Sequence, residues 1–189
     1  GGGLYKHGNT LSYWNLYNDT VFTVLPDFSI KASILLSPGK YRIPRSHFST
    51  DQFAHFFIPY KLFETNRFLV FNYAFSQRIT IALIEKVSKK SYLSYMNTVK
   101  DSRVPSYTGG IPNNLDGGMM LIPQNYFEEN GQEYLIGNIN PIQLKAHISS
   151  EEFKNSVPQY HEKKKVLERL AENIKETDNP ILIIVKLKK

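Results

Sequence analysis

Residues 67–85 read RFLVFNYAFSQRITIALIE, and this stretch decides the fold class. Two runs rich in β-branched and aromatic residues lie on either side of Ser76-Gln77, a pair that suits a turn. Such runs favour strands over helices, and two of them around a short polar pair are typical of an antiparallel hairpin. A polar turn (86–90) and a third run (91–96) follow, so the region predicts a three-stranded meander.

The N-terminal part of the chain predicts a second meander with the same layout. Strand-like runs cover 11–17, 20–25 and 30–36, and the turn pairs Asn18-Asp19 and Pro26-Asp27 separate them. Residues 40–65 are less regular, because prolines interrupt a dense set of aromatic residues. This segment predicts either a short helix over 50–57 that Ser49 caps, or a connection that packs its rings inward.

The rest of the chain begins with a long loop and ends in helices. Residues 97–118 are rich in Gly, Pro and Asn, and a connection of this length is usually functional or mobile. Strands are predicted at 119–122 and 133–136, paired around Asn130-Gly131.

Helix signals dominate after residue 139. Asn140 is expected to cap a helix with Pro141 at its first position, and Ser149 to Glu152 has the form of a capping box. Residues 159–175 have the clearest helical periodicity. Residues 181–185 read ILIIV and are apolar on both strand faces, so this strand is expected inside a sheet rather than at its edge.

Length and composition limit the classes of protein. A chain of 189 residues suits a single domain, with β meanders over 1–139, a helical segment over 140–178 and a closing strand over 179–189. The absence of cysteine excludes disulfides and thiolate metal sites. No apolar stretch approaches about 20 residues, so no transmembrane segment is expected. The formal charge of +6 includes no compact basic run beyond Lys89-Lys90, so nucleic acid is not an expected partner.

Three sequence features resemble a known family. They are Asn18-Asp19-Thr20-Val21-Phe22, the loop Leu115-Asp116-Gly117-Gly118, and the terminal run DNPILIIVKLK (178–188). With these, nearly the whole chain resembles the C-terminal half of an uncharacterised six-bladed β-propeller family of Bacteroidetes-type cell-envelope proteins. The resemblance implies a mainly β fold of antiparallel four-stranded blades, with C-terminal helices and a closing strand.

The resemblance also carries expectations about length and location. At about 40 residues a blade, this chain holds about three blades, a partial ring. It implies an exported protein of the periplasm or outer cell envelope, which a lipid could anchor through an N-terminus outside this sequence. No catalytic residue follows from the family, because its members have no agreed activity.

The long loop holds the candidate ligand-binding residues. Two glycines beside Asp116 suggest positive φ or a close backbone approach, so this turn could present a carboxylate or N–H groups to a ligand. The alternative is a purely structural turn. The candidates in this loop are Arg103, Tyr107, Asp116, Gly117 and Gly118.

Metal binding and catalysis have weaker candidates. His47, Asp51 and His55 are spaced four apart and would share one face of a helix, as metal ligands can, or they are polar rim residues. Glu128-Glu129 and Glu151-Glu152 are adjacent, whereas paired catalytic carboxylates come from separate elements. No Gly-x-Ser-x-Gly elbow or phosphate-binding glycine loop is present, and no cofactor is predicted.

Aromatic residues make up 13% of the chain and allow two interpretations. They could form a stacking platform for sugars or a packed core. The residues in question are Tyr13, Trp14, Tyr17, Tyr41 and Tyr60.

The leading hypothesis is a non-enzymatic binding or scaffold module of the cell envelope, whose ligand is a glycan, a peptide or another envelope protein. The alternative is a lyase or hydrolase that acts on a polysaccharide at the mouth of the propeller channel. A third hypothesis is a half-ring that associates with itself to complete the ring.

Overall fold

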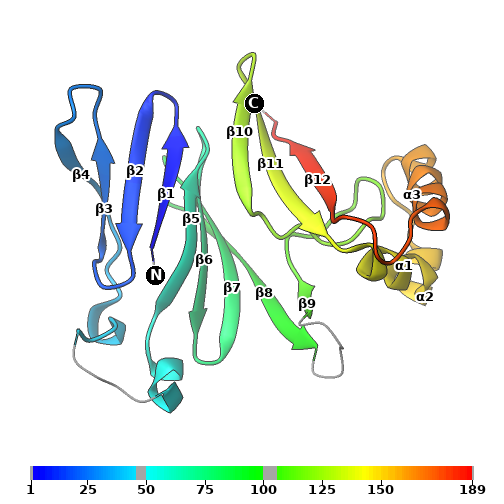
Figure 1. Ribbon diagram of the computed structural model, residues 1–189, viewed down its shortest axis with the longest axis horizontal. Helices are drawn as coiled ribbons and strands as arrows, with labels where there is room; N and C mark the ends of the chain where they lie inside the picture. Colours follow the sequence, from blue (N-terminus) through cyan, green and yellow to red (C-terminus); the bar gives the residue numbers. More distant parts are fainter. Residues whose placement is uncertain (1, 46–49, 100–105, 189) are drawn as a thin grey trace. The chain divides into compact units, whose positions relative to one another are not determined.

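The computed structural model describes residues 2–45, 50–99 and 106–188, and the chain they form is mainly β. It contains three antiparallel sheets of four, five and three strands, with a few helices (Figure 1). The three successive sheets agree with the predicted partial set of blades. The chain forms two compact units, Gly1–Tyr107 and Thr108–Lys189.

The first sheet of unit 1 confirms the predicted N-terminal meander and adds one strand to it. β1 (Gly2–His7), β2 (Thr10–Asn15), β3 (Thr20–Val24) and β4 (Ile30–Leu35) lie in sequence order. The sequence pattern does not predict β1, but packing against Trp14 explains the glycine at its start. Gly3 lies opposite Trp14, and a Cβ at Gly3 would come within 2.8 Å of the indole nitrogen, so glycine lets the ring lie over the strand.

The second sheet of unit 1 contains the hairpin at residues 67–85. β6 (Phe68–Phe75) pairs with β7 (Arg78–Glu85), and Ser76 and Gln77 both have positive φ (50° and 63°), as a tight primed turn requires. β5 (Ile58–Glu64), β8 (Ser91–Val99) and β9 (Ser106–Gly109) complete the order β5-β6-β7-β8-β9.

β5 is a strand that the sequence pattern does not predict. Pro59 lies in it, and the register with β6 shifts between Pro59 and Lys61, which blurs the alternation. Two short 3₁₀ helices precede it, η1 (Gly39–Tyr41) and η2 (Thr50–His55). The second lies within the helix predicted over 50–57, but it is 3₁₀ rather than α.

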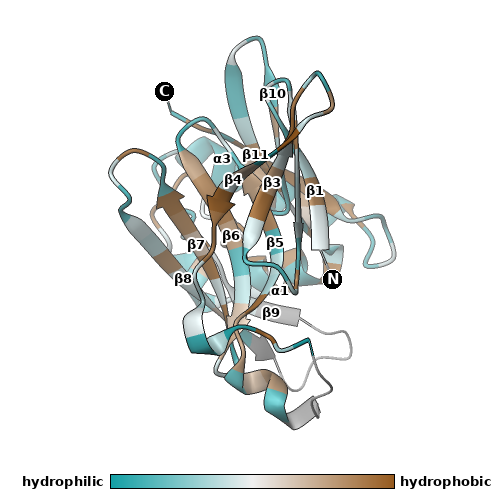
Figure 2. Ribbon diagram, turned by 90° about the vertical axis from the view of Figure 1, so that its left-hand side faces the viewer, coloured by the Kyte–Doolittle hydropathy of each residue, from teal (hydrophilic) through white to brown (hydrophobic). Residues whose placement is uncertain are grey.

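The core of unit 1 lies between its two sheets, where β1 is beside β5. Buried side chains alternate along β2, whereas β6 and β7 have consecutive buried residues, 69–72 and 80–82, so the second sheet is covered on both faces there. Hydrophobic stretches are visible along several of these strands in Figure 2. The most buried of these residues are Trp14, Val21, Leu62, Phe63, Val70 and Ile81.

Unit 2 contains the third sheet and the α-helices. β10 (Asn125–Glu129) and β11 (Gln132–Ile139) form a hairpin, and β12 (Ile181–Lys186) pairs with β11. The predicted turn at Asn130-Gly131 is confirmed. The predicted strand at 119–122 is wrong, because Leu121 makes only an isolated bridge with Ile111, and the partner of β11 begins at Asn125.

β12 lies at the edge of its sheet, so the prediction that it lies inside the sheet is wrong in the part of the chain that the structure describes. Its side chains alternate. Ile181 and Ile183 pack on a cluster that includes Leu144 and Ala171, whereas Leu182 is 64% exposed. The apolar run therefore has one face in the core and one face exposed.

The helices are α1 (Pro141–Ser149), α2 (Glu151–Asn155) and α3 (His161–Asn173). The predicted start of α1 is confirmed, since the Asn140 N–H donates to Oε1 of Gln143 (3.0 Å). The predicted cap of the next helix is shifted by one residue. Ser150, rather than Ser149, caps α2, because its Oγ accepts from the Phe153 N–H (3.1 Å).

Candidate functional site

Several connections of unit 1 lie at the same end of its sheets. This end carries the β2–β3 turn (16–19), the described parts of the β4–β5 connection (36–45 and 50–57) and the β6–β7 turn (76–77), because antiparallel meanders bring alternate turns to one edge. Backbone bonds tie these segments together. The Phe57 N–H donates to the Tyr41 carbonyl (2.8 Å), and the Ser76 N–H donates to that of Ala54 (3.0 Å). We call these segments the connection end.

Arg42 is the central polar residue of the connection end. Its Nη2 donates to the carbonyl of Tyr17 (2.8 Å), and its Nη1 lies 3.4 Å from Oδ2 of Asp19. The guanidinium thus holds the β2–β3 turn against the β4–β5 connection. The Arg42 side chain is nevertheless 41% exposed, so solvent and ligands can reach it.

A shallow, open hollow of about 10 Å³, room for about one water molecule, lies beside Arg42. One side is polar and most of the wall is apolar, so a larger ligand would lie over this surface rather than inside the hollow. Sequence spacing gives no hint of it, since the lining residues come from the β2–β3 turn, the β4–β5 connection and the start of β5. They are Leu16, Asn18, Asp19, Leu36, Pro38, Arg42, Ile43, Phe57 and Pro59.

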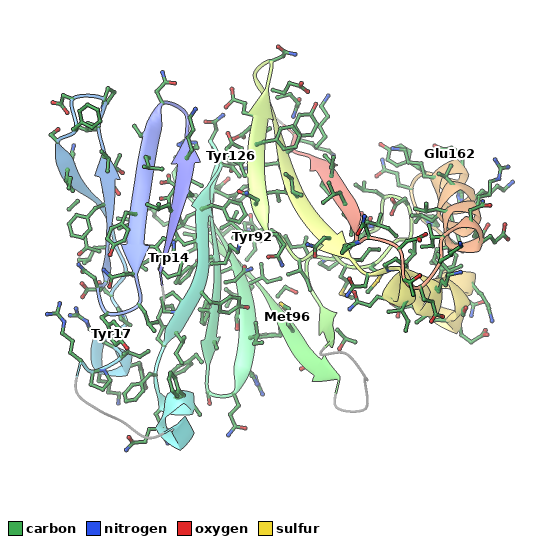
Figure 3. All side chains as sticks on the ribbon, viewed as in Figure 1. Trp14, Tyr17, Tyr92, Met96, Tyr126 and Glu162 are labelled. Atoms are coloured by element: carbon green, nitrogen blue, oxygen red, sulfur yellow. The ribbon has the colours of Figure 1, made fainter. Side chains whose placement is uncertain are left out.

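The structure separates the five aromatic residues that the sequence could group into one platform. Trp14 is 3% exposed and belongs to the core (Figure 3). Tyr13 is on β2 and Tyr60 is on β5. Tyr17 and Tyr41 belong to the connection end, where each is 42% exposed. Of the five aromatic residues, only Tyr17 and Tyr41 therefore lie on the connections that line the hollow.

Positive charge prevails among the described side chains of the connection end. Lys40, Arg42 and Arg45 lie in the β4–β5 connection, and Arg78 follows the β6–β7 turn; all four are exposed. Asp19 is the acidic residue among the side chains described there, and the side chain of Asp51, which also belongs to these segments, lies outside the description. Nζ of Lys40 lies 5.3 Å from the centre of the Tyr41 ring. The end therefore offers cations and aromatic rings together.

The predicted ligand loop over 97–118 begins at this same end. Ile79 is the partner of Met96, so β8 runs towards the edge at which β7 starts. Arg103 lies outside the described residues, and so does the side chain of Tyr107, whose backbone belongs to β9. Their assignment to a ligand stays a prediction.

The other three loop candidates form a tight turn in unit 2. Oδ1 of Asp116 accepts from Nδ2 of Asn113 (2.8 Å) and from the Gly118 N–H (2.9 Å). Gly117 has φ of +77°, and its carbonyl lies 2.8 Å from Nε2 of His147.

The same turn is packed closely against the helices. A Cβ at Gly117 would lie 3.1 Å from Oγ of Ser156. We call residues 113–118 the glycine turn. These bonds give the Asp116 carboxylate and the two glycines a structural role, and a ligand role for them stays a prediction.

The alternative metal site is only partly visible. His47 and the side chain of Asp51 lie outside the described residues, and His55 is exposed at the end of η2. The described ranges contain no group of three or more His, Asp or Glu residues that could hold a metal. The metal alternative is therefore untested.

A buried polar network lies on the side of unit 1 away from the connection end, and the sequence gives no signal for it. Tyr5 Oη donates to Oε1 of Glu64 (2.6 Å), and Lys86 Nζ lies 2.6 Å from Oε2 of the same carboxylate. Burial by itself would raise the pKa of Glu64, but the hydrogen bonds from Lys86 and Tyr5 outweigh it and lower that pKa. Burial and the bond to Glu64 raise the pKa of Tyr5.

A pair of carboxylates lies beside Tyr126 of unit 2, a residue labelled in Figure 3. Glu128 of β10 is the register partner of Glu133 of β11, and Tyr126 Oη donates to Oε2 of Glu128 (3.1 Å). Burial, followed by the two carboxylates, raises the pKa of the Tyr126 phenol. The phenol therefore keeps its proton and donates it in a hydrogen bond to Glu128.

Comparison with known proteins yields one structural relative. No family model matches the chain, and no curated protein matches it. The chain is similar to the crystal structure of a "putative exported protein" from Bacteroides fragilis, with a TM-score of 0.54 and 15% sequence identity. The match covers 98% of this chain and 49% of that protein, so this chain spans about half the length of its relative.

At this level of identity the match shows a shared fold. The predicted resemblance to Bacteroidetes-type envelope proteins thus has a structural counterpart in a Bacteroides protein, while the propeller ring stays a prediction. Across the described ranges, no helix has the length and apolar character needed to cross a membrane.

Proposed function

We propose that this chain is a non-enzymatic binding module of an exported cell-envelope protein, and that it binds an acidic glycan at the connection end of unit 1. The observation that carries the proposal is the exposed guanidinium of Arg42, which shares the connection end with exposed tyrosines and a surplus of cations.

The chemistry of these groups suits an acidic sugar. A guanidinium presents a planar fork of N–H donors that matches a carboxylate in two-point geometry. Tyrosine rings offer flat apolar faces, as at Tyr17 and Tyr41, and a polar hydroxyl at the ring's tip. A sugar with a carboxylate could thus use both kinds of group, whereas a neutral apolar ligand would use only the wall of the hollow.

We also propose that the three sheets are blades of a six-bladed propeller. Consecutive antiparallel meanders support this, as does a relative about twice as long that matches over almost the whole of this chain. Export is proposed on the description of that relative.

Titration with short oligosaccharides of galacturonic acid tests the proposed function. The variant Arg42→Gln removes the fork, and we expect binding to weaken by about tenfold, the lower range for a charge-assisted bond. Arg67→Gln is a matched control, because Arg67 is also an exposed arginine in an ion pair, with Glu85 at 2.6 Å, and this pair lies at the end of the sheet away from the connection end.

Calorimetry measures the affinities that distinguish the outcomes of this titration. Oligosaccharides of galactose, which lack the carboxylate, should bind at least tenfold more weakly than the acidic series. Equal weakening by both variants, or no binding of any uronic-acid oligosaccharide, would contradict the proposed function. Circular dichroism of Arg42→Gln checks that the β4–β5 connection is intact.

A further inference from the structure

The first sheet of unit 1 has a second face that its own unit does not bury. Cross-strand partners point to the same side of a sheet, so the register defines this face. One row runs Leu4, Tyr13, Phe22 and Ala32, and the next runs Lys6, Leu11, Val24 and Ile30. We call these eight residues the outer face.

The outer face is mostly apolar and exposed. Leu4 is 66% exposed, Leu11 is 42% exposed and Ile30 is 69% exposed, while Phe22 and Val24 are half-buried. The opposite face of the same strands carries Trp14 and Val21, which are buried. An exposed apolar surface that extends over four adjacent strands is unusual on a finished protein surface and marks an interface.

We infer that the outer face packs against a further antiparallel β-sheet of the same polypeptide, outside these 189 residues. The chain already covers the inner face of this sheet with another sheet, since β1 lies beside β5 and Tyr5 bonds to Glu64 across them. Two rows of alternating apolar side chains, Leu4 to Ala32 and Leu11 to Ile30, are the surface that face-to-face sheet packing uses.

The relative's length supports a covering sheet from the same polypeptide. This chain accounts for 49% of that protein, so about half of the relative lies outside the matched part. A sheet in that half would cover the outer face without a second chain. The inference does not depend on the ligand, because the outer face and the connection end use different residues.

Thiol labelling tests the inference, since these 189 residues contain no cysteine. Leu11→Cys and Ile30→Cys place a thiol on the outer face, and Lys31→Cys is a control on the next residue of β4, which is exposed and points to the other side. The variants are made in the polypeptide as the cell produces it. Maleimide labelling is followed by peptide mass spectrometry, and light scattering records the mass.

We expect the thiols at 11 and 30 to react at least about tenfold more slowly than the thiol at 31 in a monomeric protein, as burial in a stable interface requires. Equal labelling rates at all three positions would overturn the inference. Protection that appears only at concentrations where the protein dimerises would also overturn it, because a second copy would then cover the face. Far-ultraviolet circular dichroism of each variant excludes unfolding as the cause of fast labelling.

Discussion

Glu64 shows how one side chain can join two sheets. It accepts from Tyr5 on β1 and pairs with Lys86 after β7, while its own side chain is only 15% exposed. A carboxylate so placed needs both partners, because an unpaired buried charge is costly. The sequence could not reveal the contact, since 59 positions separate Tyr5 from Glu64.

We predict that Glu64→Gln destabilises the protein by about 2 kcal/mol at neutral pH, because Lys86 and Tyr5 lose their charged acceptor. Urea unfolding measures this change. Tyr5→Phe is the milder companion variant, with a loss of about 1 kcal/mol, since it removes one hydrogen bond and keeps the ring. Equal stability of Glu64→Gln and the parent chain would refute the role of the network.

The lowered pKa of Glu64 also predicts that the stability of the folded chain depends on pH. The pKa of Glu64 in the folded chain lies below its unfolded value of 4.5, so its contribution is fully present above 4.5. That contribution is lost as the pH falls through the lowered folded pKa. We therefore expect the parent chain and Glu64→Gln to converge in stability between pH 4.5 and the acid limit of folding. A gap that stays constant on acidification would contradict this assignment.

Two glycines provide a matched test of the glycine turn. Gly117 and Gly131 have similar positive φ values of 77° and 71°, but a Cβ would meet Ser156 only at Gly117. We predict that Gly131→Ala lowers the free energy of unfolding by about 1 kcal/mol, the backbone strain of a non-glycine residue at positive φ. Gly117→Ala should cost about 1–3 kcal/mol more, because the added methyl overpacks the turn against α2. Equal losses in urea unfolding would show that the turn is not packed as described.

At the scale of elements, strands made of uninterrupted β-branched and aromatic runs could be predicted and the others could not. β6, β7 and β8 follow from residues 67–96, because each run is β-branched and aromatic with polar turns between. β1 escapes prediction because two of its residues are glycines, and β5 because Pro59 and a register shift interrupt it. Their strand state depends on partners distant in the sequence.

β12 shows that an apolar sequence alone does not predict how many faces of a strand are buried. Five apolar residues in a row suggest a strand covered on both faces, but β12 is an edge strand with alternating exposure. We predict that Ile183→Ala costs about 2 kcal/mol, because Ile183 packs on the cluster around Leu144 and Ala171. Leu182→Ala should change stability by less than about 0.5 kcal/mol, as expected for an exposed side chain.

Thermal unfolding of the two β12 variants measures the difference directly. A larger loss for Leu182→Ala than for Ile183→Ala would mean that the exposed face of β12 is covered in solution. That result would revive the original prediction of a strand between partners.

At the scale of the whole molecule, the sequence predicts the class of fold better than the site. A mainly β chain of successive meanders follows from local patterns alone, and the predicted long loop begins at the connection end that forms the candidate site. Arg42 was not predicted as a site residue, because its partners Tyr17 and Asp19 reach it only through tertiary folding. Asp116, Gly117 and Gly118 were predicted from their composition, and their bonds are those of a turn.

The net charge of +6 predicts a salt dependence for an acidic ligand. Cations at the connection end are exposed, and the attraction between exposed charges is screened beyond roughly 10 Å at 0.1 M salt. We expect the affinity for galacturonic acid oligosaccharides to fall as salt rises, and that for any neutral oligosaccharide to stay nearly constant. Titration at two salt concentrations measures both, and equal salt responses would contradict the role of charge.

Mapping of backbone amide chemical shifts during a titration with galacturonic acid oligosaccharides is the most direct test of the binding proposal. We expect the largest changes in chemical shift at Tyr17, Asp19 and Arg42, and we expect the glycine turn of unit 2 to be unaffected. Changes centred on Asp116 to Gly118 would move the site to the loop that the sequence first suggested. An unchanged spectrum at saturating oligosaccharide would contradict the proposal itself.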